Sequence, residues 1–186
     1  ACGWTYNASG IPSNVSRFNG LSSGYRGTNG VYTDINRSDI MWSATLFNAT
    51  TSYYAYTTHD SNVLTKTTID NRLGNSLRCL LTNTKDWKLG DKVRDIDGNW
   101  YPTVQIGNQI WLGSNLKTTR YNDGTAIPNV TDNTAWAALT TGAYCTYNNA
   151  ALVEYSEVTR YKGERFEETF ADLNCDGNAV VPKDWI

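Results

Sequence analysis

The sequence predicts an α+β domain that is mostly β, built from short antiparallel strands and long loops. Asparagine, threonine, serine, glycine and tyrosine dominate the chain, and these residues favour turns and short strands over long helices. Short apolar runs alternate with turn signals such as Asn-Gly and Asp-Gly, which is the pattern of antiparallel strands joined by tight turns. Seven Trp and twelve Tyr among 186 residues indicate a packed, ordered chain.

The first part of the chain predicts a group of neighbouring antiparallel strands. Residues 1–30 carry a glycine every few positions and are expected to form loops. Downstream, runs rich in strand formers are separated by turn residues at short intervals, and this spacing predicts a meander. The expected strands are Ile40–Phe47, Ser52–Thr57, Asn62–Ile69 and Ser76–Leu81.

The second part opens with the clearest hairpin of the sequence. Asp97-Gly98 is a favoured tight turn with strand-forming runs on both sides. Asp132–Leu139 is expected to be a short helix capped by Asp132 or Thr131. The charged segment Val153–Phe170 can be a helix or a solvated segment, because its period does not decide between them. The strands expected around the turn are Val93–Ile96, Trp100–Ile106 and Gln109–Leu112.

Charge and composition exclude several classes of partner. The formal net charge is −2 and no basic stripe is present, so no nucleic-acid partner is expected. No apolar run approaches the length of a membrane span, so none is expected. His59 is the single histidine and no Cys-x-x-Cys pair occurs, so we expect no metal site and no cofactor.

The cysteines predict disulfide bonds. An even number of widely spaced cysteines fits two bonds formed in an oxidising compartment. Pairing Cys145 with Cys175 would close a loop of about 30 residues and contribute roughly 3–4 kcal/mol, which leaves Cys2 with Cys79. The other pairings, and four buried free thiols, stay open.

Several blocks of the sequence resemble one bacterial family, the Fibrobacter major paralogous (FISUMP) domain. The blocks that resemble the opening of that domain are Asp95-Ile-Asp-Gly-Asn99, Thr103-Val-Gln-Ile-Gly107, Gln109-Ile-Trp111 and Asn115-Leu-Lys-Thr-Thr119. The blocks that resemble its end are Arg17–Arg26, Met41-Trp-Ser-Ala-Thr45 and Leu77-Arg-Cys79. Cys175–Asp184 resembles an internal block of the family but lacks its Trp and His.

The resemblance implies that the two halves of one module stand in exchanged order. Residues 1–81 resemble its C-terminal half, residues 94–186 its N-terminal half, and residues 82–93 connect them. The family is similar to C-type-lectin-like folds found on or outside bacterial cells, so the resemblance implies an extracellular or cell-surface module of that type, permuted or split. It also implies a further pairing, Cys79 with Cys175. A circularly permuted gene, a tandem array divided across a module boundary, and subunits that each supply half a domain to the next all fit the exchange.

The function expected from this organisation is structural. An incomplete sheet leaves strand edges that a neighbour can bury head to tail, so the chain is expected to be a non-enzymatic extracellular subunit of a surface filament or adhesin array. The alternative is a monomeric lectin-like module that binds a glycan or a protein. No serine lies in a Gly-x-Ser-x-Gly elbow and no phosphate-binding glycine loop is present, so no enzyme and no catalytic residue is expected.

The candidate ligand-binding residues lie in and after one expected strand. Sugar sites use aromatic faces together with planar polar groups, although ordinary sheet packing also explains the tyrosines. Asp95, Asp97 and Asn99 alternate as calcium ligands do, but tight hairpins use Asp-Gly without a metal, and the hairpin explanation is favoured. The candidates are Tyr53, Tyr54, Tyr56, His59, Asp60 and Asn62.

Overall fold

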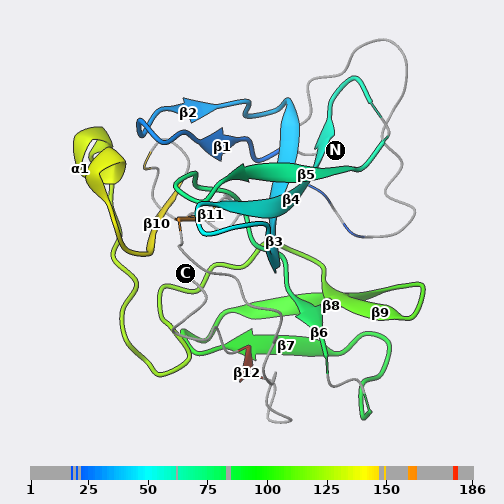
Figure 1. The fold of residues 1–186 in the computed structure, drawn as a ribbon. Coiled ribbons are helices and arrows are strands. Elements are labelled where there is room, and N and C mark those ends of the chain that lie inside the picture. The colour runs from blue at the N-terminus through cyan, green and yellow to red at the C-terminus, as the bar shows by residue number, and fades with distance from the viewer. Residues whose placement is uncertain are drawn as a thin grey trace.

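The protein is mostly β, as the sequence predicts, with short antiparallel strands and long loops. The computed structural model describes residues 18, 20, 22–61, 63–82, 85–146 and 149, and the backbone of residues 159–162 and 178–179. Figure 1 shows strands β1–β5 in one layer and strands β6–β9 in a second layer below it, with helix α1 at one side. No helix in the described part of the chain is long and apolar enough to cross a membrane.

The first half of the chain forms a three-stranded antiparallel sheet beside a small hairpin. The hairpin joins β1 (Tyr25–Arg26) to β2 (Tyr32–Thr33). The predicted meander is confirmed for the next three strands, which are neighbours in sequence order. These strands are β3 (Ser38–Leu46), β4 (Thr51–Thr58) and β5 (Thr65–Asp70).

The last strand predicted for this group leaves the meander. Ser76 forms a parallel bridge with Met41, after which the chain crosses to the other layer. There β6 (Leu80–Leu81) pairs antiparallel with β9 (Gln109–Leu112). The prediction that Ser76–Leu81 continues the meander is therefore wrong, because the apolar side chains at its end pack into a core built mainly by the second half.

The predicted hairpin and helix of the second half are confirmed. Strands β7 (Lys92–Asp95) and β8 (Trp100–Ile106) flank the Asp97-Gly98 turn, and β8 continues into β9. Helix α1 (Asn133–Ala138) begins after Asp132, whose side chain accepts a hydrogen bond from the Ala135 amide at 2.7 Å. The complete sheet has the order β12-β7-β8-β9-β6, with β12 (Asn178–Ala179) parallel to β7.

A separate pair of strands lies beyond the helix. β10 (Ala143–Thr146) pairs antiparallel with β11 (Thr159–Lys162). Strand β11 lies within the charged segment Val153–Phe170, so its four residues do not form the helix that the sequence allowed there.

The largest apolar cluster contains side chains from both halves of the chain. Leu81 belongs to it, and Leu77 and Cys79 pack against it from the first half. Leu77 also packs against a second cluster around Trp42 and Leu73. The two layers therefore share a boundary rather than forming two finished cores. The second-half members of the large cluster are Val93, Tyr101, Ile110, Leu112, Leu116, Tyr121 and Ile127.

Candidate functional site

The most extensive site in the described chain is the junction between its two halves, which we call the closing interface. We define it as the contacts that residues 18–81 make with residues 94–146. It contains a strand pair, two buried arginines and a buried tryptophan.

The strand pair joins the halves through backbone hydrogen bonds. Leu80 lies opposite Trp111 and Leu81 opposite Ile110. The amide of Leu112 donates to the Cys79 carbonyl at 2.9 Å, and the amide of Leu116 donates to the Leu77 carbonyl at 2.8 Å. Residues 77–81 thereby form one edge of a sheet whose other strands all come from the second half.

Arg78 anchors this segment from inside the protein. Its side chain is only 4% exposed, and its Nε donates to Oδ1 of Asn115 at 3.0 Å. Nη2 donates to the same oxygen, and Nη1 donates to the carbonyl oxygen of Phe18. The guanidinium carbon also lies 4.4 Å from the centre of the Phe18 ring. A buried cation held by oxygen acceptors and one ring face fixes the position of this segment against the second half.

Arg26 forms the second anchor, at the other end of the interface. It is fully buried, and its guanidinium lies over the rings of Tyr32 and Trp136, at 4.9 and 4.3 Å from their centres. Among the described residues, every acceptor that it contacts is a carbonyl or amide oxygen rather than a carboxylate. These acceptors are the carbonyls of Gly30, Val130 and Thr131 and the side-chain oxygen of Asn133.

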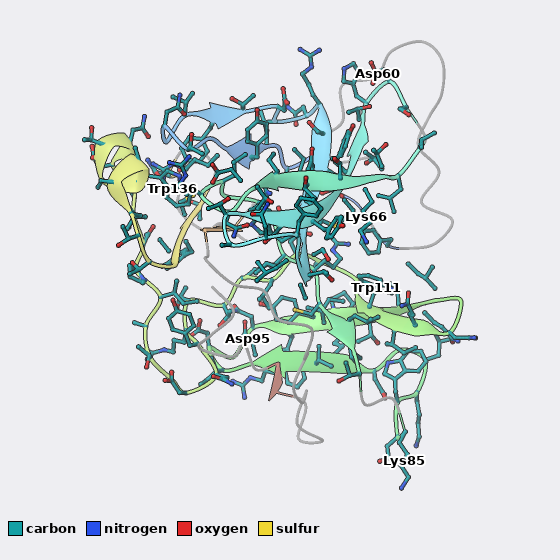
Figure 2. All side chains as sticks on the ribbon, in the orientation of Figure 1. Asp60, Lys66, Lys85, Asp95, Trp111 and Trp136 are labelled. Atoms are coloured by element: carbon teal, nitrogen blue, oxygen red, sulfur yellow. The ribbon has the colours of Figure 1, made fainter. Side chains whose placement is uncertain are left out.

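Trp136 completes this anchor from helix α1. The side chain is fully buried, and its Nε1 donates to the Gly27 carbonyl at 3.1 Å. Gly74 approaches the same ring so closely that a Cβ there would lie 2.8 Å from Cζ2. The closing interface therefore fits glycine at this position and has no room for a side chain. Figure 2 shows Trp136 beside the helix, and it labels Trp111 on the lower sheet.

The hairpin acids are held by hydrogen bonds within the second half. The Asp95 carboxylate is buried and accepts from the Asn99 amide and side chain at 2.8 Å each, and from the Tyr101 hydroxyl at 2.6 Å. The same hydroxyl accepts from the Lys117 amide at 2.8 Å. These hydrogen bonds are the ones that a tight hairpin built on Asp95 and Asn99 would make.

Asp97 ties the hairpin turn to the following loop. Its Oδ2 accepts from the amide and the hydroxyl of Thr119, the latter at 2.8 Å, and Arg120 Nε lies 3.1 Å from Oδ1. Among the described residues, no group of three or more His, Cys, Asp or Glu side chains is placed to hold a metal ion.

The connector between the halves is anchored at its far end. Trp87 packs against the large apolar cluster, and its Nε1 donates to Oγ1 of Thr103 at 2.9 Å. The Thr103 hydroxyl donates in turn to the Asp91 carbonyl at 2.6 Å. The end of the predicted connector thus belongs structurally to the second half, and β7 already begins at Lys92.

The predicted tyrosine site is divided between the two faces of its sheet. Tyr54 and Tyr56 stack on one face, with ring centres 5.4 Å apart, and Tyr54 packs toward the Trp42 cluster. Burial of its side chain is the main cause that raises the pKa of Tyr54. Tyr53 lies on the other face, edge-on to Phe47 at 5.7 Å and beneath Lys66 Nζ at 4.3 Å. The three tyrosines therefore do not form one binding surface.

The remaining candidates lie in the turn after β4. His59 is half-buried and its amide donates to the Arg37 carbonyl at 2.8 Å. Asp60 is exposed, and a hydrogen bond from Thr58 is the main cause that lowers its pKa. Figure 2 shows Asp60 at the upper end of the molecule, apart from Lys66. Asn62 lies outside the described residues.

Both described cysteines are free thiols in the structure. Cys145 is buried beside Trp136, and Cys79 is half-buried beside the large cluster. Burial of its sulfur, with the nearby Asp95 charge, raises the pKa of the Cys79 thiol to about 12, against a smaller opposing effect of Arg78. Cys2 and Cys175 lie outside the described residues, so the predicted disulfide pairings stay predictions.

Sequence reasoning did not select Arg26, Arg78, Asn115 or Trp136 as functional residues. The available signal was a charged residue inside the apolar segment Leu77–Cys79, in a chain with only 18% charged residues. Arg26 and Arg78 do stand in the blocks that carry the FISUMP resemblance.

Comparisons of this chain with models of protein families, with curated proteins and with solved structures find no match. The FISUMP resemblance, and the C-type-lectin-like topology that it implies, therefore stay predictions.

Proposed function

We propose that the chain is a non-enzymatic extracellular structural subunit of a surface filament or adhesin array, and that the closing interface is the contact through which it assembles. The observation that carries this proposal is the chemistry of that interface. It combines a shared sheet, a shared apolar core and two buried arginines, which is the character of a permanent contact rather than a transient one.

The contacts that close the chain on itself are available to a neighbouring chain. β6 ends at Leu81, and Trp87 already packs into the second half, so a short connector joins the two partners of the interface. Connectors of this kind allow an identical element to be exchanged between subunits. Head-to-tail exchange that does not close on itself produces a filament.

Concentration decides between the two modes of closure. A short connector holds the halves at an effective concentration of about millimolar, so closure within one chain is favoured in dilute solution. Chains crowded on a cell surface reach the concentrations at which exchange between chains competes with closure within one chain. The same contacts form whether the two halves belong to one chain or to neighbouring chains.

A cysteine pair across the interface tests this proposal. Leu80→Cys with Trp111→Cys places thiols on directly opposite residues of different halves. The matched control, Ala55→Cys with Lys66→Cys, places them opposite one another within one half. After oxidation of concentrated or surface-bound protein, exchange gives a ladder of covalent oligomers for the first pair and monomers for the control. Monomers for both pairs at every concentration, with no filaments in electron micrographs, would overturn the proposal.

A monomeric lectin-like module that binds a glycan or protein is the second candidate. The observation that favours it is an exposed aromatic group on the sheet: Phe47 is 59% exposed and lies against Tyr53, with Lys66 above the Tyr53 ring. Phe47→Ala should then abolish binding to a glycan panel, while Trp100→Ala, at an equally exposed tryptophan, should leave it unchanged. No binding by the unsubstituted chain contradicts this candidate.

A further inference from the structure

Strand β5 forms the outer edge of the three-stranded sheet. The sheet order is β3-β4-β5, and within the described residues no strand pairs with the outer side of β5. β5 contains no proline, and its first residues are exposed or half-buried. An edge strand of this kind can template pairing with another chain.

The register of the sheet identifies which backbone groups face outward. The Asn71 amide donates to the Thr50 carbonyl at 2.9 Å, and Asp70 lies opposite Thr51. Hydrogen-bonded and non-hydrogen-bonded pairs alternate along an antiparallel ladder. The backbone N–H and C=O groups of Lys66, Thr68 and Asp70 therefore point away from β4.

We propose that the β5 edge docks a second copy of this chain, through antiparallel pairing about a two-fold axis at Thr68. In this register Thr68 lies opposite the partner's Thr68, and Lys66 lies opposite the partner's Asp70. All three outward-facing residues then lie opposite one another. Because the Asp70 carbonyl already accepts from the Leu73 amide at 3.2 Å, the pairing gives about four intermolecular hydrogen bonds. The interface is isologous, since the same six-residue strand is used on both sides.

Charge selects this register over its neighbours. Registers slipped by two residues have their axis at Thr67 or Ile69, and they set Lys66 or Asp70 opposite a partner threonine that offers no counter-charge. Registers slipped by four residues have their axis at Lys66 or Asp70 and set like charges opposite one another. The axis at Thr68 instead sets each Lys66 against a carboxylate, and opposite charges on facing strand residues are stabilising. A lysine on an edge strand commonly discourages pairing. Here Asp70, four residues along the same face, supplies its counter-charge.

This contact is independent of the proposed function, because it involves no residue of the closing interface. A two-fold contact alone closes at a dimer. Combined with exchange across the closing interface, it gives each chain two different contacts and links the assembled chains laterally.

Sedimentation analysis of the whole chain over a concentration series tests the β5 dimer. Lys66→Glu and Asp70→Lys each turn both facing pairs into like-charge pairs, and each is expected to weaken the dimer about tenfold. An equimolar mixture of the two variants restores opposite charges at both pairs, so it should dimerise as the unsubstituted chain does. The double variant Lys66→Glu/Asp70→Lys should also recover self-association.

Thr68→Pro supplies a second test at the centre of the interface. Its amide points away from β4, so proline removes an intermolecular donor and leaves the ladder to β4 intact. Loss of the dimer with an unchanged melting transition supports the proposal. A chain that stays monomeric at all concentrations, or variants that associate as strongly as the unsubstituted chain, would overturn it. A dimer that ignores Lys66 and Asp70 but is captured by the Leu80→Cys/Trp111→Cys pair would instead support exchange across the closing interface alone.

Discussion

The guanidinium of Arg78 donates through Nε to Oδ1 of Asn115 at 3.0 Å, and this bond joins the two halves of the chain inside the protein. Both side chains are almost completely buried. Removal of either side chain takes from the other, inside the protein, the hydrogen bonds that join them, so the two are expected to be energetically coupled.

A double-mutant cycle measures that coupling. Arg78→Met and Asn115→Ala should each lower the free energy of unfolding by about 2–4 kcal/mol, with a coupling of about 1–3 kcal/mol between them. Urea denaturation monitored by tryptophan fluorescence gives all four values. Arg72→Met, which removes a surface ion pair to Asp70, should cost less than about 1 kcal/mol and is the control. A coupling near zero would contradict the role of the Arg78–Asn115 bond.

Arg26 should not tolerate replacement by lysine. The guanidinium donates to four oxygens in a planar fork and stacks on Tyr32 and Trp136, and an ammonium group reproduces neither feature. We expect Arg26→Lys to lower the free energy of unfolding by about 3 kcal/mol. Arg94→Lys is the matched control, since Arg94 is exposed over the ring of Trp100. Equal losses of unfolding free energy in the two variants would contradict a specific requirement for the guanidinium group at Arg26.

Tyr101 should be sensitive to loss of its hydroxyl alone. The hydroxyl is fully buried, donates to Asp95 and accepts from the Lys117 amide. Tyr101→Phe leaves a buried carboxylate with one donor fewer and a backbone amide without its acceptor, at a cost of about 1–3 kcal/mol. Tyr53→Phe, on the half-exposed sheet face, should change stability by less than about 0.5 kcal/mol. Chemical denaturation midpoints of the two variants test this prediction. Equal midpoints for Tyr101→Phe and Tyr53→Phe would contradict it.

Local signals in the sequence predicted strands β3–β5 and β7–β9 and the helix correctly, whereas β1 lies in the stretch 1–30 that was expected to form loops. Asp97-Gly98 specifies its hairpin through backbone conformation alone, and Asp132 specifies the start of α1 through one short-range hydrogen bond. The alternation of β4 likewise fixes that Tyr53 and Tyr54 face opposite sides, which divides the predicted tyrosine site. Interactions of this kind act between residues that are close in the sequence, so a local sequence pattern is enough to predict them.

The closing interface could not be predicted in this way. Arg26 contacts residues more than a hundred positions away, and Arg78 contacts Asn115 at a separation of 37. The apolar neighbours of Arg78 indicate that it is buried, but they do not indicate which distant residue it contacts. Ser76–Leu81 has the composition of a meander strand, yet only its last two residues form a strand, β6. They pair with the second half because Leu81 packs into the apolar cluster that the second half mainly builds.

Gly74 should not accept even a methyl group. A Cβ at this position would lie 2.8 Å from Trp136 Cζ2 and 3.3 Å from Arg26 Cβ, and neither of those buried side chains has room to move away. We expect Gly74→Ala to destabilise the protein by about 1–3 kcal/mol, as overpacking of a core does. Trp136→Phe in the same chain should recover part of that loss, because it removes the atoms that clash. Thermal unfolding of the three variants shows whether the effects are non-additive; strictly additive losses contradict the predicted contact.

The Cys79 thiol should be nearly inert while the protein is folded. Its pKa is raised from 9.0 to about 12, so at pH 8 the reactive thiolate is roughly a thousandfold rarer than in the unfolded chain. Because the folded pKa is the higher one, the stability that this thiol contributes is complete below about pH 9 and is lost as the pH rises toward 12.

Alkylation at pH 8, with mass spectrometry to locate the label, tests the Cys79 prediction. The rate in native buffer should be lower than the rate in denaturant by about the same factor of a thousand. The loss of stability between pH 9 and 12 should also be smaller in Cys79→Ala, which leaves every other titratable side chain in place. Equal labelling rates contradict the burial of the sulfur. A lack of labelling in denaturant until reductant is added would show that Cys79 is held in a disulfide bond, as the sequence predicted.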